Sequence, residues 1–416
     1  MDDYVITELI RQHADEAAST WELRGTIIQG PHYTLAEVIE FDDRIEANLD
    51  GLRIAGEAGW EICNEAWGEA DTGALFVLSV MGFGHDREDR ARAVLEAAAD
   101  SPESWPEVAS ALGWHTFAKV EREVRHLSHA QSPVLRLIGM AAAAIHRRDP
   151  GRPLDDALTD DDPALRARAL KAAGELGRLD LLPRLSENLK SDDEKCRFYA
   201  AWSAALLSGE TKAVEVLKEL AVSDSTHREQ ALQMASRRMV LPAALSWREE
   251  LARSEATLRQ ALLGAGIIGD PIAIPWLIEQ MQVQTTARLA AESFTMLTGL
   301  DLALENLEGD PPEGFEAGPN DDPEDEDVEM DPDEFLPWPK VEGISQWWHR
   351  HQTDFQSGTR YLIGQPIKGD WLQVVLRRGY QRQRAAAALE LTRRQPGQPL
   401  FEVRGPGFRQ KQLLSE

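Results

Sequence analysis

Arginines recur at a nearly fixed interval through the middle of this chain. Successive gaps between them are 30, 31, 31, 31 and 29 residues. The six residues are Arg136, Arg166, Arg197, Arg228, Arg259 and Arg288. Each opens a run rich in Ala and Leu, such as LRARALKAAGELG or LRQALLGAGIIG. A period of this size is typical of a solenoid built from stacked helix pairs, so the sequence predicts an all-α repeat array.

The array extends beyond the arginines that mark it. The apolar runs GALFVLSVMGFG and ESWPEVASALGWH stand about two periods and one period before Arg136, respectively, so we expect about eight helix pairs. Helical spacing of apolar residues before them predicts a helical N-terminal cap, because terminal units of solenoids are usually atypical. The expected organisation is a cap at 1–70, an array at 71–307, an insert at 308–335 and a small aromatic and basic C-terminal module at 336–416.

Charge is distributed unevenly along the chain. The formal net charge is −27, and residues 308–335 hold 14 acids without a Lys or Arg. That segment is also rich in Pro and Gly, which predicts a disordered insert. An acidic surface repels phosphate backbones and suits a protein partner better than nucleic acid. The C-terminal module is basic, and we expect it to pack on the acidic array.

An acid stands four residues before each of the four central arginines. The pairs are Asp162 and Arg166, Asp193 and Arg197, Asp224 and Arg228, and Glu255 and Arg259. Asp-x-x-x-Arg at the head of an Ala-rich second helix resembles HEAT repeats, and the short period resembles their phycobilisome-lyase type. The resemblance implies that the second helices line a concave face. It also implies that the acids and arginines form a structural ladder between units.

The two ends of the chain carry a further resemblance. YTLAEVIEFDDRIEANLDGLRIAG near the start and QRQRAAAALELTRRQPGQPLFEVRGPGFRQ near the end look like a family of bacterial HEAT-repeat proteins. Genes of that family tend to sit in type VI secretion clusters. The resemblance implies an accessory role in secretion, as adaptor, chaperone or immunity-type protein, with an effector, adaptor or spike component as partner. The family carries no defined catalytic residues to transfer.

Candidate binding residues follow from the positions two, five and nine after each arginine. The set expected to face the groove is Arg168, Lys171, Tyr199, Trp202, Gln230, Gln233 and Arg237. Aromatic side chains flanked by Arg, Lys and Gln have the composition of a protein interface. The alternative is that Tyr199 and Trp202 turn inward between helices, which is the commoner place for aromatic residues.

The sequence offers no catalytic motif. It lacks a Gly-rich phosphate loop and a G-x-S-x-G elbow, and His349 and His351 fall on different sides of a helix. We therefore expect a cytoplasmic protein-binding scaffold without enzyme activity, cofactor, metal or membrane span. Two alternatives remain open. One is an enzyme resembling HEAT-like chromophore lyases, and the other is a solenoid that grips nucleic acid through Arg168, Lys171, Arg237 and Arg238.

Overall fold

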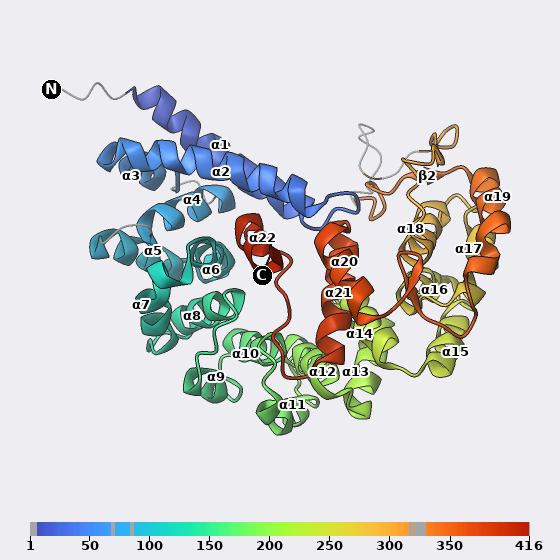
Figure 1. The fold of residues 1–416 in the computed structure, drawn as a ribbon. Helices are drawn as coiled ribbons and strands as arrows, with labels where there is room; N and C mark the ends of the chain where they lie inside the picture. The colour runs from blue at the N-terminus through green and yellow to red at the C-terminus, as the bar shows by residue number, and fades with distance from the viewer. Residues whose placement is uncertain (1–5, 68–70, 84–86, 316–317, 319–329, 416) are drawn as a thin grey trace, which may run out of the picture. The chain divides into compact units, whose positions relative to one another are not determined.

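Nearly all of the regular structure is helical (Figure 1). The computed structural model describes residues 6–67, 71–83, 87–315, 318 and 330–415. Two compact units divide the chain: unit 1 is Met1–Ala213 with Arg377–Glu416, and unit 2 is Val214–Leu376. The helices α13 (Thr211–Ala221) and α20 (Gly369–Arg378) cross the two boundaries. Within the described ranges, no helix combines the length and apolar character needed to cross a membrane.

Unit 1 opens with three helices and continues as helix pairs. The opening helices are α1 (Thr7–Ile27), α2 (Leu35–Ala55) and α3 (Glu57–Ala66). The second helix of each pair packs against the second helix of the next, and we call these the inner helices. They are α4 (Thr72–Phe83), α6 (Trp105–Trp114), α8 (Pro133–Ile145), α10 (Pro163–Glu175) and α12 (Glu194–Ser208). The outer helices are α5 (Glu88–Asp100), α7 (Phe117–Ser128), α9 (Arg152–Ala157) and α11 (Leu182–Asn188).

Unit 2 continues the same alternation and adds short strands. Its inner helices are α14 (Arg228–Arg238), α16 (Glu255–Ile268) and α18 (Ala287–Thr298). Its outer helices are α15 (Leu241–Leu251) and α17 (Ile274–Gln280), and α19 (Val341–His351) follows. Two antiparallel pairs complete it, β1 (Glu308–Gly309) with β2 (Trp338–Pro339) and β3 (Tyr361–Leu362) with β4 (Gln365–Pro366). Five inner helices in unit 1 and three in unit 2 confirm the predicted solenoid of about eight pairs.

Local sequence signals set the ends of the inner helices. The Asp162 carboxylate accepts a hydrogen bond from the backbone N–H of Leu165 at 2.9 Å, and Asp193 does the same for Cys196 at 2.7 Å. Such caps satisfy backbone donors that a helix start leaves without a partner. Gly209 and Gly269 end α12 and α16 at φ 68° and 71°, a left-handed conformation that favours glycine.

The arginines of the predicted ladder make different contacts from the ones expected. Arg166 donates to the carbonyl of Asp160 at 2.5 Å, and Arg197 donates to the carbonyl of Ser191 at 2.8 Å. The upstream carboxylates are engaged as helix caps, so each of these arginines folds back on its own preceding turn instead. Of the remaining members, Asp224 and Arg228 are exposed, and Glu255 lies in the first turn of α16.

Contacts between neighbouring units are nevertheless present at two steps of the array. Burial opposes ionisation of Asp193, but hydrogen bonds from Cys196 and the charge of Arg166 in the preceding unit lower its pKa. Arg259 on α16 lies 3.6 Å from the Glu229 carboxylate on α14. Exposed pairs of this kind stabilise a fold by only about 0–1 kcal/mol. Their main effect is therefore to fix how neighbouring helix pairs align with one another.

Serines and small residues hold adjacent inner helices close together. The Ser203 hydroxyl on α12 donates to the Leu170 carbonyl on α10 at 2.7 Å, and Ser293 on α18 donates to Leu262 on α16 at 2.8 Å. A Cβ at Gly174 would stand 3.0 Å from the Cα of Ser203. The backbones can therefore approach only because these positions are small.

The predicted disordered insert, 308–335, is ordered at both ends. Glu308–Gly309 forms β1, and Asp333 makes two 2.9 Å contacts with the Arg259 guanidinium. Asp331 pairs with Arg288 at 2.6 Å. The charge pattern alone misses this order because the arginines that balance these acids lie far away in sequence. Residues 316–317 and 319–329 of the insert lie outside the described residues.

In unit 2, a segment after α19 crosses the C-terminal ends of the inner helices. Arg360 donates to the carbonyls of Ser236 and Met239 at the end of α14. The backbone N–H of Tyr361 donates to Gly269 after α16, and that of Ile363 donates to Met296 of α18. The last carbonyls of a helix have no partner within it, so this segment supplies the missing donors.

Substitution of Gly174 should test the close approach of α10 and α12. A methyl group would clash with the Ser203 backbone, and overpacking costs about 1–3 kcal/mol, more than the gain of about 1 kcal/mol from alanine in a helix. We expect Gly174→Ala to lower the free energy of unfolding in urea. Gly25→Ala on α1 is the matched control, because a Cβ there meets nothing within 4 Å. Equal stability of the two variants would contradict this packing.

Two histidines, one buried and one half-buried, also join successive inner helices. Nε2 of His115 lies 3.1 Å from the Val80 carbonyl of α4, and Nε2 of His146 lies 2.9 Å from the Leu112 carbonyl of α6. Burial lowers the pKa of both imidazoles from 6.5 to about 4. The unfolded chain therefore binds more protons than the folded one. Their contribution to stability is present above pH 6.5 and is lost as the pH falls towards 4.

Replacing both histidines with glutamine should flatten the acid side of the stability profile. Between pH 7.5 and pH 5 the wild-type protein should lose about 2 kcal/mol of unfolding free energy per histidine, and the double variant should not. Urea unfolding at the two pH values measures the difference. His126→Gln, at an exposed position on α7, should follow the wild type. An unchanged pH slope in the double variant would contradict a role for His115 and His146.

Candidate binding site

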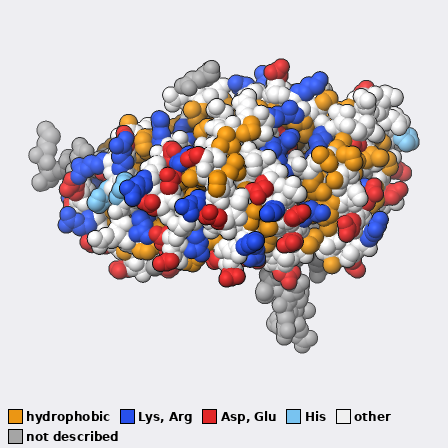
Figure 2. All heavy atoms as spheres, turned by 90° about the horizontal axis from the view of Figure 1, so that it is seen from below, with side chains coloured by type: hydrophobic (Ala, Val, Ile, Leu, Met, Phe, Trp, Pro, Cys, Tyr) orange, Lys and Arg blue, Asp and Glu red, His pale blue; other side chains and the backbone are white. Residues whose placement is uncertain are grey.

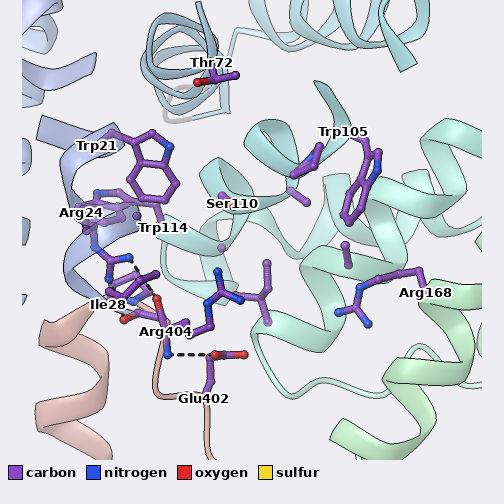
Figure 3. A pocket seen from close by; sticks show the side chains of 18 of the residues that line it. Trp21, Arg24, Ile28, Thr72, Trp105, Ser110, Trp114, Arg168, Glu402 and Arg404 are labelled. Atoms are coloured by element: carbon purple, nitrogen blue, oxygen red, sulfur yellow. Dashed lines mark hydrogen bonds between the residues drawn. The ribbon is translucent and has the colours of Figure 1, made fainter. Parts of the chain in front are cut away.

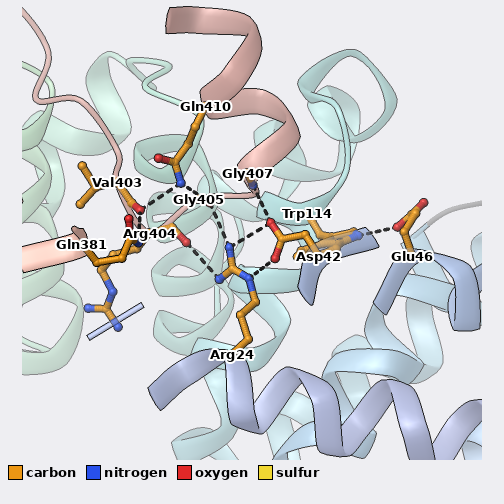
Figure 4. A network of polar contacts seen from close by, with 10 residues as sticks. All are labelled: Arg24, Asp42, Glu46, Trp114, Gln381, Val403, Arg404, Gly405, Gly407 and Gln410. Carbon is orange, nitrogen blue, oxygen red and sulfur yellow. Dashed lines mark hydrogen bonds and ion pairs between the residues drawn. The ribbon is translucent and has the colours of Figure 1, made fainter. Parts of the chain in front are cut away.

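The end of the chain returns along unit 1 and is fixed there by a buried ion pair (Figure 4). Arg24 on α1 donates through Nε and Nη2 to Asp42 on α2, and the two side chains are only 3% and 1% exposed. Arg24 also donates to the carbonyls of Arg404 and Gly405, at 3.1 and 3.0 Å. Asp42 accepts the backbone N–H of Gly407 at 2.5 Å. One ion pair thus joins α1, α2 and the returning C-terminal segment.

This segment lies between α21 (Gln381–Arg394) and α22 (Gly407–Ser415), and we call residues 395–406 the strap. Its Leu400 N–H donates to the Glu175 carbonyl at the end of α10, at 2.8 Å. Arg147, just after α8, donates to the Leu400 carbonyl at 2.5 Å and pairs with Glu402 at 2.9 Å. Arg147 has φ 54°, a strained conformation for a residue with a side chain. The strap therefore caps α10, as residues 360–364 cap inner helices in unit 2.

A cavity of about 350 Å³ lies between the strap and the inner helices (Figure 3). We call it the tryptophan cavity, because three indoles line it. Figure 3 shows Trp21 and Trp114 on one side and Trp105 on the other. The remaining lining includes Ile28, Thr72, Ser110, Ile145, Arg168, Lys171, Glu175, Glu402 and Arg404. Its size is that of a small-molecule site.

The indoles are held by neighbouring aromatic rings and by one hydrogen bond. Trp21 stacks on Phe76 with ring centroids 3.6 Å apart, and Trp114 meets Trp21 edge to face at 5.9 Å. Nε1 of Trp114 donates to Glu46 at 2.7 Å. Rings fixed in this way present flat apolar walls whose positions are set before any ligand arrives.

Charged groups gather at the end of the cavity formed by α10 and the strap. Arg168 donates to Glu175 at 2.9 Å, and the Lys171 ammonium lies 3.8 Å from the same carboxylate. Burial opposes ionisation of Glu175, but the charges of Arg168, Lys171 and Arg147 outweigh it and lower its pKa to about 2. Burial also lowers the pKa of Lys171, and Glu175 opposes that shift. Glu175 is therefore a carboxylate shared by two cations.

The structure brings together only part of the predicted groove set. Arg168 and Lys171 line the tryptophan cavity, and Nζ of Lys171 lies 5.4 Å from the ring centroid of Tyr199. Tyr199 and Trp202 on α12 are half-buried, which is intermediate between the two placements weighed from the sequence. In unit 2, Gln230 and Gln233 on α14 are exposed, whereas Arg237 is buried with 4% exposure.

Sequence reasoning missed the strap and the tryptophans. The lining residues come from five helices and a segment more than 200 residues away, so no local spacing signals the site. The one available signal was the run PLFEVRGPGF, whose Glu402 and Arg404 stand among apolar and turn-forming residues. In the described part of the chain, no group of three or more His, Cys, Asp or Glu side chains is placed to hold a metal ion.

Breaking the ion pair at Asp42 should loosen the strap. Asp42→Asn keeps the shape but leaves the Arg24 charge buried, which costs about 3 kcal/mol. We expect a lower free energy of unfolding and faster protease cleavage within 395–406, measured by urea unfolding and limited proteolysis. Asp43→Asn is the matched control, since Asp43 is the next residue and is exposed. Equal cleavage rates in the two variants would show that Asp42 does not hold the strap.

Residues 152–237 match the family model of HEAT repeats. The matched region spans α9 to α14, and no curated protein matches the chain. Helix pairs of the same kind flank the match on both sides, so the chain is an all-α solenoid of HEAT-like repeats.

Proposed function

We propose that this protein is a scaffold that binds another protein through its HEAT-like repeats. The observation that carries the proposal is the HEAT match over 152–237, since repeats of this kind commonly serve as protein-interaction surfaces. The match includes α14, whose Gln230 and Gln233 side chains are exposed. Adaptable amides on a rigid helix suit the polar, solvent-accessible part of a protein interface.

The strap changes where the partner would bind. Two predicted groove residues in unit 1, Arg168 and Lys171, line the tryptophan cavity together with strap residues, and Arg168 is only 9% exposed. We therefore place the partner contact on α14 in unit 2. Figure 2 shows hydrophobic side chains exposed among acidic and basic ones over one face of the molecule, a mixture that protein interfaces share with ordinary surface.

The finer proposal is an accessory role in type VI secretion, as adaptor, chaperone or immunity-type protein in the cytoplasm. It rests on the resemblance of the two chain ends described above. The C-terminal part of that resemblance includes the strap, whose residues Glu402, Arg404, Gly405 and Pro406 line the tryptophan cavity. The residues that carry the resemblance thus build a specific structure, as expected if a shared function depends on it.

The two alternatives have less support. A nucleic-acid-binding surface needs a stripe of exposed basic side chains. Arg168 and Arg237 are buried, with only 9% and 4% of their surface exposed. An enzyme needs reactive groups in a pocket, and the titratable groups lining the tryptophan cavity are Arg, Lys and Glu residues without His or Cys. HEAT-repeat folds are typically scaffolds without catalysis of their own.

Affinity purification from the native host, followed by mass spectrometry, should test the proposal. The full chain should recover a specific protein, and a component of a secretion machine would support the finer role. Gln230→Lys with Gln233→Lys should lower that recovery at least tenfold, because two cations would disrupt the contact. The matched control is Gln282→Lys with Gln284→Lys, exposed glutamines in the turn that follows α17 in the same unit.

Three outcomes of this experiment separate the parts of the proposal. Recovery of no protein above an unrelated bait would overturn the scaffold function. Equal recovery with both pairs of variants would retain the scaffold and remove the contact from α14. Recovery only of proteins unrelated to secretion would overturn the finer role.

A further inference from the structure

We propose that the tryptophan cavity binds a small organic anion, a carboxylate or phosphate joined to a flat aromatic body. This inference is independent of the scaffold function proposed above. The cavity has two chemically distinct ends. Trp21, Trp105 and Trp114 supply apolar faces at one, and Arg168, Lys171 and Arg404 supply positive charge at the other.

The positive charges around the cavity are not balanced. The charge of Arg24 is matched by Asp42, and that of Glu402 by Arg147. Glu22 is exposed at the rim, where it accepts a hydrogen bond from Thr72 at 2.9 Å. Arg168 and Lys171 then share Glu175, and Arg404, which is exposed like Glu22, adds a further positive charge. A ligand with one or two negative charges would restore the balance.

Two of these cations have donors left for a ligand. Among the described residues, no acceptor lies within hydrogen-bonding distance of the Lys171 ammonium, and its nearest carboxylate oxygen is 3.8 Å away. The guanidinium of Arg404 likewise has no protein acceptor within the described ranges. Figure 3 shows that the guanidinium groups of Arg404 and Arg168 enter the cavity from different sides. An anion between them could receive hydrogen bonds from α10 and the strap together.

The indole faces of the cavity determine the chemistry of the non-ionic part of the ligand. Trp21 is fixed by its 3.6 Å stack on Phe76, and Trp114 by its hydrogen bond to Glu46. Fixed indole faces bind flat aromatic groups with little loss of conformational entropy. At about 350 Å³ the cavity holds one bicyclic ring system with its anionic group. Such a ligand would contact both the array and the strap, so it would also stabilise the strap in place.

The test uses the full chain and a matched pair of probes, 2-naphthoate and its neutral analogue 2-naphthamide. Isothermal titration calorimetry should show naphthoate binding at least tenfold more tightly than the amide, because only the carboxylate receives the charge-assisted hydrogen bonds. Lys171→Met should weaken naphthoate binding at least tenfold and leave amide binding unchanged. Lys218→Met is the matched control, since Lys218, like Lys171 over Tyr199, lies over an aromatic ring, that of Trp247 at 5.3 Å, outside this cavity.

A second readout is independent of calorimetry. Saturating naphthoate should slow protease cleavage of the strap in the wild type and in Lys218→Met, but not in Lys171→Met. Circular dichroism establishes that the variants are folded. The proposal is overturned if naphthoate fails to bind at millimolar concentration, if the amide binds equally well, or if Lys171→Met binds like the wild type. Tighter binding of the peptide acetyl-Ala-Ala-Trp with a free carboxylate would also overturn it, in favour of a polypeptide terminus.

Discussion

Hydrogen bonding to the C-terminal ends of the inner helices is the interaction on which the rest of the structure depends. Each helix ends with carbonyl groups that no residue of its own can satisfy, and the helix dipole adds partial negative charge there. In unit 1, Leu400 donates to the last residue of α10, and Arg409 donates to the Gly113 carbonyl of α6. In unit 2, Arg360 and Tyr361 perform the same task for α14 and α16. Such carbonyls can also be hydrogen-bonded by water. Here, residues from other parts of the chain donate to them.

This arrangement explains why the basic C-terminal region carries arginine more often than lysine. A guanidinium presents several N–H groups in a fixed plane, so one side chain can serve two carbonyls, as Arg360 does for Ser236 and Met239. Arg24 makes the same use of its donors towards Arg404 and Gly405 while it pairs with Asp42. The contact between the strap and the array is therefore specific backbone recognition, and general attraction between a basic tail and an acidic body is a minor part of it.

The sequence predicts the repeats well because their determinants are local. The period of the arginines places the inner helices, and Asp162 and Asp193 cap α10 and α12 as their positions before the helix suggest. The candidate site depends on contacts of another kind. Arg24 and Gly405 are 381 residues apart, and the tryptophans of the cavity come from α1 and α6. Charge composition also fails at Asp333, which reads as part of a disordered acidic run but is paired with Arg259. A contact between two single residues far apart in the sequence produces no repeating pattern from which it could be predicted.

The same distinction bears on how a scaffold of this kind can acquire a ligand site. Inner helices built from Ala, Ser and Gly can pack with their backbones close together, as Ser203 against Gly174 illustrates. The tryptophan cavity arises where a segment from elsewhere spans the helices without filling the space between them. The strap does this with Glu402 and Arg404, because Gly405 and Pro406 turn the chain towards Asp42. Of the cations proposed to hold the anion, Arg168 and Lys171 lie on α10 and Arg404 lies on the strap. The site is therefore complete only when the strap is docked, and any anion held there would report on the position of the strap.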